Sequence, residues 1–181
     1  MGILLRKLDR IQTWDLDHRA PFPWLRAGEF QADPLGDLNT SGNAISVYEI
    51  DENEENLTQV AGALSVSRGR YDRFDYVLFP ESVVSELGLR LVNTLGQTAD
   101  AQVNQCHRDI SEISSHRLVE LVERIFRNQK RFGSVAERDI IKSIIDGLND
   151  KRIKYASIRK SLERLQERAN KLGLQIPPES T

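Results

Sequence analysis

The run Phe74-Asp75-Tyr76-Val77-Leu78-Phe79 is almost continuously apolar. A short run of this kind is the pattern of a β-strand that is buried on both faces. Upstream, Ala44 to Ile50 is rich in β-branched and aromatic residues and predicts another strand. Between the two, apolar side chains recur at helical spacing and predict an amphipathic helix, which Gly69 can end; they are Leu57, Val60, Ala61 and Leu64.

Downstream of this run the pattern continues as a short helix and a further strand. Pro80 is acceptable at the start of a helix that reaches Leu87, and Gly88 can close it. Leu89 to Val92 then reads as a third strand, so the order is β-α-β-α-β and favours a small parallel sheet. Only nine residues separate Phe79 from Leu89, whereas a parallel crossover takes a dozen or more. The third segment is therefore an edge strand or not a strand.

The first 42 residues give weaker signals. Residues 3–12 have apolar side chains near helical spacing and predict a short helix. Residues 14–42 hold no period and are punctuated by proline and glycine, which predicts loops with at most one short strand.

From Thr98 onward the pattern is helical. Apolar residues at spacings of three and four predict a first helix through Val103, Cys106, Ile110 and Ile113 and a second through Leu118 to Ile125. Ser134 and Glu137 form a capping-box pattern before a third apolar stripe that runs from Ile140 to Leu148. The last helix has the clearest seam, and Gly173 and Pro177-Pro178 stop it; the seam residues are Tyr155, Ile158, Leu162, Leu165, Ala169 and Leu172.

These elements predict an α+β, or small α/β, fold. Residues 1–97 form a compact acidic mixed sheet–helix unit, and residues 98–176 form an all-helical region of about four helices that is basic from residue 124. Residues 177–181 are a short tail.

Composition excludes several classes of protein. The 181 residues are 39% hydrophobic and 29% charged, which is ordinary for a globular chain able to bury its own core. Cys106 is the only cysteine, so no disulfide can form within the chain, and a reducing compartment is favoured. The apolar run at the N-terminus is too short for a signal peptide, and no stretch approaches the ~20 residues that span a bilayer. We therefore predict a cytoplasmic protein without a membrane partner.

The small net charge conceals a strong asymmetry. Residues 1–123 carry 11 Lys and Arg against 20 Asp and Glu, a net −9, whereas residues 124–171 carry 14 against 6, a net +8. Such a division indicates a charged partner. An equally good explanation of this charge asymmetry is that the two halves attract each other or that neighbouring copies pair head to tail.

No motif in the sequence fixes a reaction. Glycine-rich phosphate loops and the nucleophile elbow are absent. The spacing of cysteine and histidine matches no zinc site, and we predict no cofactor and no structural metal. Cys106 beside His107 is better explained as a small buried residue on the apolar stripe than as a nucleophile. Two acidic clusters are weak candidates for acid–base or divalent-metal chemistry. The first lies in the N-terminal loop and consists of Asp15, Asp17 and His18. The second, Glu49 and Asp51, lies at the end of the predicted strand 44–50.

The basic helices carry the stronger functional signal. Residues 134–171 read as helix, turn and helix, and short polar residues at the start of the second helix suit a recognition helix in a major groove. Against this, both helices are long for that motif, and Glu163 and Glu167 interrupt the positive charge. The candidate contact residues for a partner or for nucleic acid are Lys151, Arg152, Lys154, Arg159, Lys160, Arg164 and Arg168.

The leading hypothesis is a non-catalytic interaction or regulatory protein that uses these basic helices to bind a protein partner or to self-associate. The alternative is a nucleic-acid-binding protein with a helix-turn-helix-like element at residues 134–171. The third hypothesis is a small metal-dependent hydrolase centred on the acidic clusters.

Overall fold

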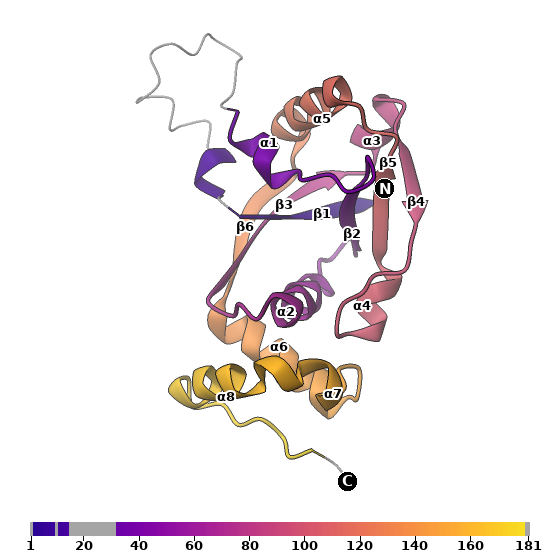
Figure 1. The fold of residues 1–181 in the computed structure, drawn as a ribbon. Helices are drawn as coiled ribbons and strands as arrows, with labels where there is room; N and C mark the ends of the chain where they lie inside the picture. The colour runs from indigo at the N-terminus through magenta and orange to yellow at the C-terminus, as the bar shows by residue number, and fades with distance from the viewer. Residues whose placement is uncertain (1, 10, 15–31, 180–181) are drawn as a thin grey trace. The chain divides into compact units, whose positions relative to one another are not determined.

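The computed structural model describes residues 2–9, 11–14 and 32–179 (Figure 1). Its strands are β1 (Ile3–Leu8), β2 (Ile45–Ile50), β3 (Arg73–Pro80), β4 (Arg90–Asn93), β5 (His107–Ser111) and β6 (Arg131–Ala136). Its α-helices are α1 (Pro34–Asp37), α2 (Leu57–Arg68), α3 (Ser82–Glu86), α4 (Ala101–Gln105), α5 (Ser115–Asn128), α6 (Glu137–Asn149), α7 (Tyr155–Ile158) and α8 (Leu162–Lys171). Two 3-10 turns are η1 (Ile11–Trp14) and η3 (Arg159–Ser161). The fold is therefore α+β.

The six strands form one sheet in the order β4-β5-β2-β1-β3-β6. The central pair β1–β3 is antiparallel, with Leu5 opposite Leu78, and so is the pair β4–β5, with Leu91 opposite Ile110. The predicted buried strand is confirmed as β3, whose residues 76–79 are all buried. The third predicted strand is confirmed as the edge strand β4. The small parallel sheet expected of the three predicted strands is wrong, because none of them are neighbours: β1 lies between β2 and β3, and β5 lies between β4 and β2.

The helix predicted over residues 3–12 is wrong, because residues 3–8 form strand β1. Leu4 and Leu5 are adjacent and both almost fully buried. Successive side chains of a strand point to opposite faces, so β1 is covered on both. A strand buried in this way loses the alternation of polar and apolar residues that would distinguish it from a short helix.

The all-helical layout of residues 98–176 is only partly correct, because two strands lie within it. The predicted stripe from Val103 to Ile113 breaks after α4, and Ile110 lies in β5 opposite Leu91 of β4. The second strand is β6, and it contains Ser134. The capping box therefore does not form: α6 begins at Glu137, and the Ser134 hydroxyl instead accepts hydrogen bonds from Arg73 Nε and Nη2 at 3.1 and 2.7 Å.

The remaining helix predictions are confirmed as α2, α3, α5, α6 and the segment α7–η3–α8. Gly69 ends α2 in the left-handed conformation, with φ of +61°, as its position after the helix suggested.

The chain divides into two compact units. Unit 1 comprises residues 1–47, 75–93 and 108–133, and unit 2 comprises residues 48–74, 94–107 and 134–181. In unit 1 the core includes α5 packed on α3 and α1, with Trp14 stacked on Phe126 at 4.9 Å between ring centroids. In unit 2 the main packing is α2 against α6, and α8 in turn contacts α6 (Figure 1).

Candidate partner-binding surface

The turn between α6 and α7 positions the first of the predicted contact residues. The C-terminal end of α6 is satisfied by the chain that follows it, because Lys151 N–H donates to Leu148 O at 3.2 Å and Ile153 N–H to Gly147 O at 2.9 Å. Lys151 adopts a φ of +59° to make this reversal. Ile153 is buried against Gly147, which leaves the neighbouring Lys151 and Lys154 exposed.

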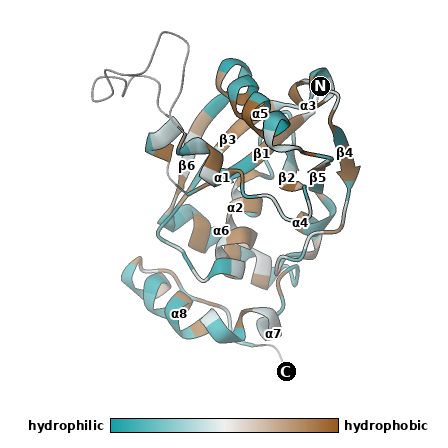
Figure 2. Cartoon of the chain, turned by 45° about the horizontal axis from the view of Figure 1, so that its top comes forward, coloured by the Kyte–Doolittle hydropathy of each residue, from teal (hydrophilic) through white to brown (hydrophobic). Residues whose placement is uncertain are grey.

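Helix α8 returns along α6. Leu165 and Ala169 are fully buried, whereas the outward side of α8 is hydrophilic (Figure 2). Arg168 of α8 forms an ion pair with Glu137 of α6 at 3.0 Å, and both side chains are about one-third exposed. Arg168 thus fastens the two helices to each other.

Arg152 also has a partner within unit 2. Its guanidinium bonds the carboxylate of Asp100, whose side chain is 1% exposed, and lies 3.5 Å from Asp150. Asp100 also caps α4 by accepting hydrogen bonds from the backbone N–H groups of Gln102 and Val103. The pair joins the α6–α7 turn to the start of α4, so Arg152 has a structural role.

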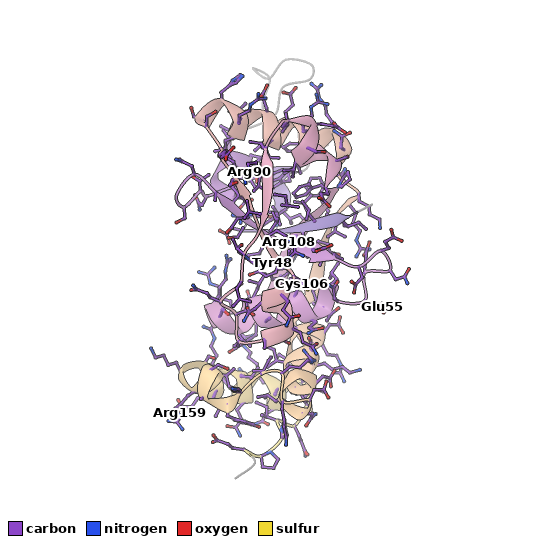
Figure 3. The ribbon with its side chains drawn as sticks, turned by 90° about the vertical axis from the view of Figure 1, so that its right-hand side faces the viewer. Tyr48, Glu55, Arg90, Cys106, Arg108 and Arg159 are labelled. Carbon is purple, nitrogen blue, oxygen red and sulfur yellow. The ribbon has the colours of Figure 1, made fainter. Side chains whose placement is uncertain are left out.

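The other five predicted contact residues have a different environment. Within the described residues they take part in no ion pair, and all are exposed; they are Lys151, Lys154, Arg159, Lys160 and Arg164, which we call the basic patch. Figure 3 shows the Arg159 side chain directed away from the ribbon. Along the segment α7–η3–α8, the first acidic residue in the sequence is Glu163.

The arginines of α5 and the lysine at the end of α8 form ion pairs. On α5, Arg117 bonds Glu120 at 2.8 Å, Arg124 lies 3.7 Å from Glu86, and Arg127 bonds Glu123. At the end of α8, Lys171 bonds Glu167 at 2.6 Å, and this hydrogen bond holds the pKa of Glu167 below its ordinary value. The basic patch differs from these segments because none of its five cations forms an ion pair among the described residues.

The buried carboxylates have structural partners. Asp37 accepts hydrogen bonds from Trp14 Nε1 and from the backbone N–H of Asp9, both at 2.8 Å, and so ties η1 to α1. Among the described residues, every buried side-chain nitrogen or oxygen has a hydrogen-bond partner. Asp37 and Asp100 therefore hold together segments that are distant in the sequence.

The two weak metal candidates have different outcomes. Asp15, Asp17 and His18 lie outside the described residues. Glu49 and Asp51 are exposed at the end of β2, where the Asn56 side chain donates to Glu49 O and accepts from Asp51 N–H, both at 3.1 Å. This bonding is that of an Asn-stabilised turn. In the part of the chain that the structure describes, no group of three or more potential metal ligands is present.

Cys106 and His107 do not lie on one apolar stripe. Cys106 caps the C-terminal end of α4 and is half-buried rather than buried (Figure 3), and His107 begins β5. The imidazole Nδ1 lies 2.8 Å from Thr94 Oγ1, and the ring packs edge-on against Tyr48 at 5.1 Å. The prediction that Cys106 is buried on the apolar stripe of a helix is therefore wrong, because the helix ends before Cys106 and a strand begins after it.

A cavity beside the α6–α7 turn was not predicted. Lys151 and Lys154 line it together with the tail residues Pro177, Pro178 and Glu179. The available signal was the Pro177-Pro178 pair beyond the end of the last helix, because consecutive prolines favour an extended chain.

Comparisons with family models, with curated proteins and with solved structures gave no match for this chain. None of the helices in the described residues is both long enough and apolar enough to cross a membrane.

Proposed function

We propose that this protein is a non-catalytic interaction or regulatory protein that binds an acidic protein partner through the basic patch. The observation that carries the proposal is the contrast in pairing: the arginines of α5 and Lys171 at the end of α8 have acidic partners, whereas the five residues of the basic patch make no ion pair in the described residues. Uncompensated charge of one sign attracts and orients a partner of the opposite sign.

The location of the patch also supports binding to a surface. Its residues lie on a turn and on the outward side of helices whose inward side packs on α6. Replacing exposed charges there changes folding stability by at most ~0.5 kcal/mol, so the patch contributes little to the fold.

The test replaces three patch residues by acids in the full-length chain: Arg159→Glu, Lys160→Glu and Arg164→Glu. The matched control carries Arg117→Glu, Arg124→Glu and Arg127→Glu on α5. Each tagged chain is used for capture from a nuclease-treated native lysate, and its oligomeric state is measured by light scattering. We expect the patch variant to lose an acidic protein that the wild type and the control retain.

Two results would contradict the proposal. If the patch variant keeps every captured protein and the wild-type oligomeric state, the patch is not a binding surface. If capture by the wild type disappears after nuclease treatment, the surface serves nucleic acid, and log K for DNA or RNA should then fall linearly with log of the salt concentration.

A further inference from the structure

A cavity of about 550 Å³ lies beside the turn that joins α6 to α7. This volume is in the range of pockets that hold ligands. Its apolar walls include Leu148, Ile153 and Ala156 from the helices and the turn. The opposite wall is the C-terminal tail, which we define as residues 173–179.

The tail is held over the turn by a small number of contacts. Gly173, with a φ of +69°, ends the helix, and Leu174 N–H returns to Ala169 O at 2.9 Å. The chain then continues without regular structure, and the Tyr155 hydroxyl donates a hydrogen bond to Pro177 O. Pro178 and Glu179 remain exposed. A tyrosine donor on a backbone carbonyl is a contact that any extended peptide can make.

The tail leaves this site partly open. Pro178 and Glu179 line it and are nevertheless exposed. A segment with an apolar residue larger than proline would cover more of the apolar walls and gain dispersion contacts with them.

The charges of the site are also incompletely balanced. Lys151 and Lys154 line the cavity and form no ion pair in the described residues, and Glu179 is the only acid among the lining residues. Burial, and then the negative charge of Glu179, raise the pKa of Tyr155. The site therefore favours a segment with more negative charge than the tail supplies.

We propose that this cavity binds an extended segment of a partner protein that carries an apolar side chain larger than proline beside acidic residues, and that the tail is the competitor it displaces. The inference rests on the proposed function and names the element of the partner that is recognised. The apolar walls and the Tyr155 donor suit a peptide backbone better than the sugar–phosphate backbone of a nucleic acid.

Displacement sets the expected magnitudes. A short tether gives the tail an effective concentration in the millimolar range, so it occupies the site even when its own contacts are weak. The apparent Kd of an added peptide rises in inverse proportion to the fraction of chains with an open site. Loosening the tail should therefore tighten peptide binding by about five- to tenfold.

The experiment measures fluorescence anisotropy with a labelled peptide and the full-length chain. The probe has the sequence of residues 173–179, Gly-Leu-Gln-Ile-Pro-Pro-Glu, with Pro178→Phe; a second probe also carries Glu179→Lys. We expect the first probe to bind the wild type at least tenfold more tightly than the second. The chain variant Pro177→Gly with Pro178→Gly should bind the first probe more tightly than the wild type does.

Two charge variants test the site itself. Lys151→Glu with Lys154→Glu should weaken binding of the first probe at least tenfold, with an unchanged circular dichroism spectrum. Lys142→Glu, on the exposed side of α6 and outside the cavity, should leave it within twofold. Equal binding of both probes, an equal effect of Lys142→Glu, or no response to the tail variant would each overturn the inference.

The two proposals fail separately. If the Arg159, Lys160 and Arg164 variant binds the first probe normally but the wild type captures no protein, the cavity is a peptide site and the wider interaction role fails. If random-sequence single-stranded DNA displaces the probe at 150 mM salt and depends equally on Lys151 and Lys154, the peptide inference is overturned in favour of nucleic acid.

Discussion

Asp100 is almost fully buried, and four hydrogen bonds converge on its carboxylate. It accepts hydrogen bonds from two backbone N–H groups at the start of α4, from Gln59 Nε2 at 3.2 Å, and from the guanidinium of Arg152. A buried ion pair contributes little compared with apolar residues of the same shape, but removing one member leaves a charge without compensation. This asymmetry makes the pair a sensitive site for substitution.

We therefore expect Asp100→Asn to lower the free energy of unfolding by about 3 kcal/mol. Asn is as good an N-cap as Asp, so the cost reports mainly the lost ion pair. The matched control is Asp150→Asn, because exposed Asp150 lies near the same guanidinium; it should cost under about 0.5 kcal/mol. Urea unfolding measures both. Equal costs would show that Asp100 and Arg152 do not form a buried pair.

Tyr71 gives a prediction about pH. Burial raises the pKa of Tyr71 above its ordinary value, and the hydroxyl lies 3.5 Å from Ser161 O. The folded chain thus holds this proton more tightly than the unfolded chain, in which tyrosine titrates near ~10. The stabilisation is fully present below that pH and is lost as the pH rises through the folded pKa.

Tyr71→Phe should cost about 1 kcal/mol at pH 8 through the lost hydrogen bond. Above about pH 10 the difference from the wild type should shrink, since Phe has no proton to lose. Chemical denaturation at the two pH values measures the difference directly. A gap that stays constant or widens with pH would contradict the assignment.

Single-residue roles were only partly predictable from the sequence. The sequence identified seven basic candidate residues, but it did not show that Arg152 and Arg168 form structural ion pairs whereas the other five form none. Their partners Asp100 and Glu137 are 52 and 31 positions away. Pairing over such separations depends on tertiary structure, whereas i,i+4 pairs such as Glu167–Lys171 can be read directly.

At the level of elements, the long amphipathic helices were predictable, whereas three of the short strands were not. Helices α2, α5 and α6 have 12 to 14 residues, enough turns for a periodic stripe to appear. Strands β1, β5 and β6 have five or six residues, and their apolar spacings also fit a helix. Pairing with neighbouring strands decides their conformation, and pairing is not encoded locally.

The contact between α2 and α6 depends on Gly62. A Cβ at this position would lie 2.9 Å from Ser143 Oγ and 3.2 Å from Ser143 Cβ. We expect Gly62→Val to lower the free energy of unfolding by about 2 kcal/mol, because the helices must separate or distort. Thermal unfolding measures this effect.

Two controls separate crowding from helix propensity. Gly36→Ala places a Cβ in open space in α1 and should be neutral or stabilising. Ser143→Gly should recover part of the loss when it is combined with Gly62→Val. If Gly62→Val is as stable as the wild type, α2 and α6 do not approach closely at this point.

For the molecule as a whole, the charge division of the sequence does not follow the compact units. Unit 2 contains the acidic run 51–55 as well as the basic patch, and unit 1 contains most of the paired charges of α5. The change from negative to positive net charge at residue 124 therefore describes the linear sequence and does not correspond to a division between the compact units. The patch is distinguished by its lack of ion pairs rather than by the net charge of its half.

The chain passes between the two units inside strands. Residue ranges of both units occur within β2, β3, β5 and β6, so the boundary cuts four strands of the sheet. Each unit nevertheless buries a core of its own, which a substitution within that unit can probe.

Leu121→Ala on α5 tests the core of unit 1. The side chain is fully buried, and its truncation should cost about 3 kcal/mol. Native-state hydrogen exchange should then show lower protection of the α5 amides. Ile144→Ala on α6 makes the same test in unit 2, where the amides of α2, which packs on α6, should lose protection. Unchanged protection of α5 in the first variant, or of α2 in the second, would show that the truncated side chain does not support the packing of its unit.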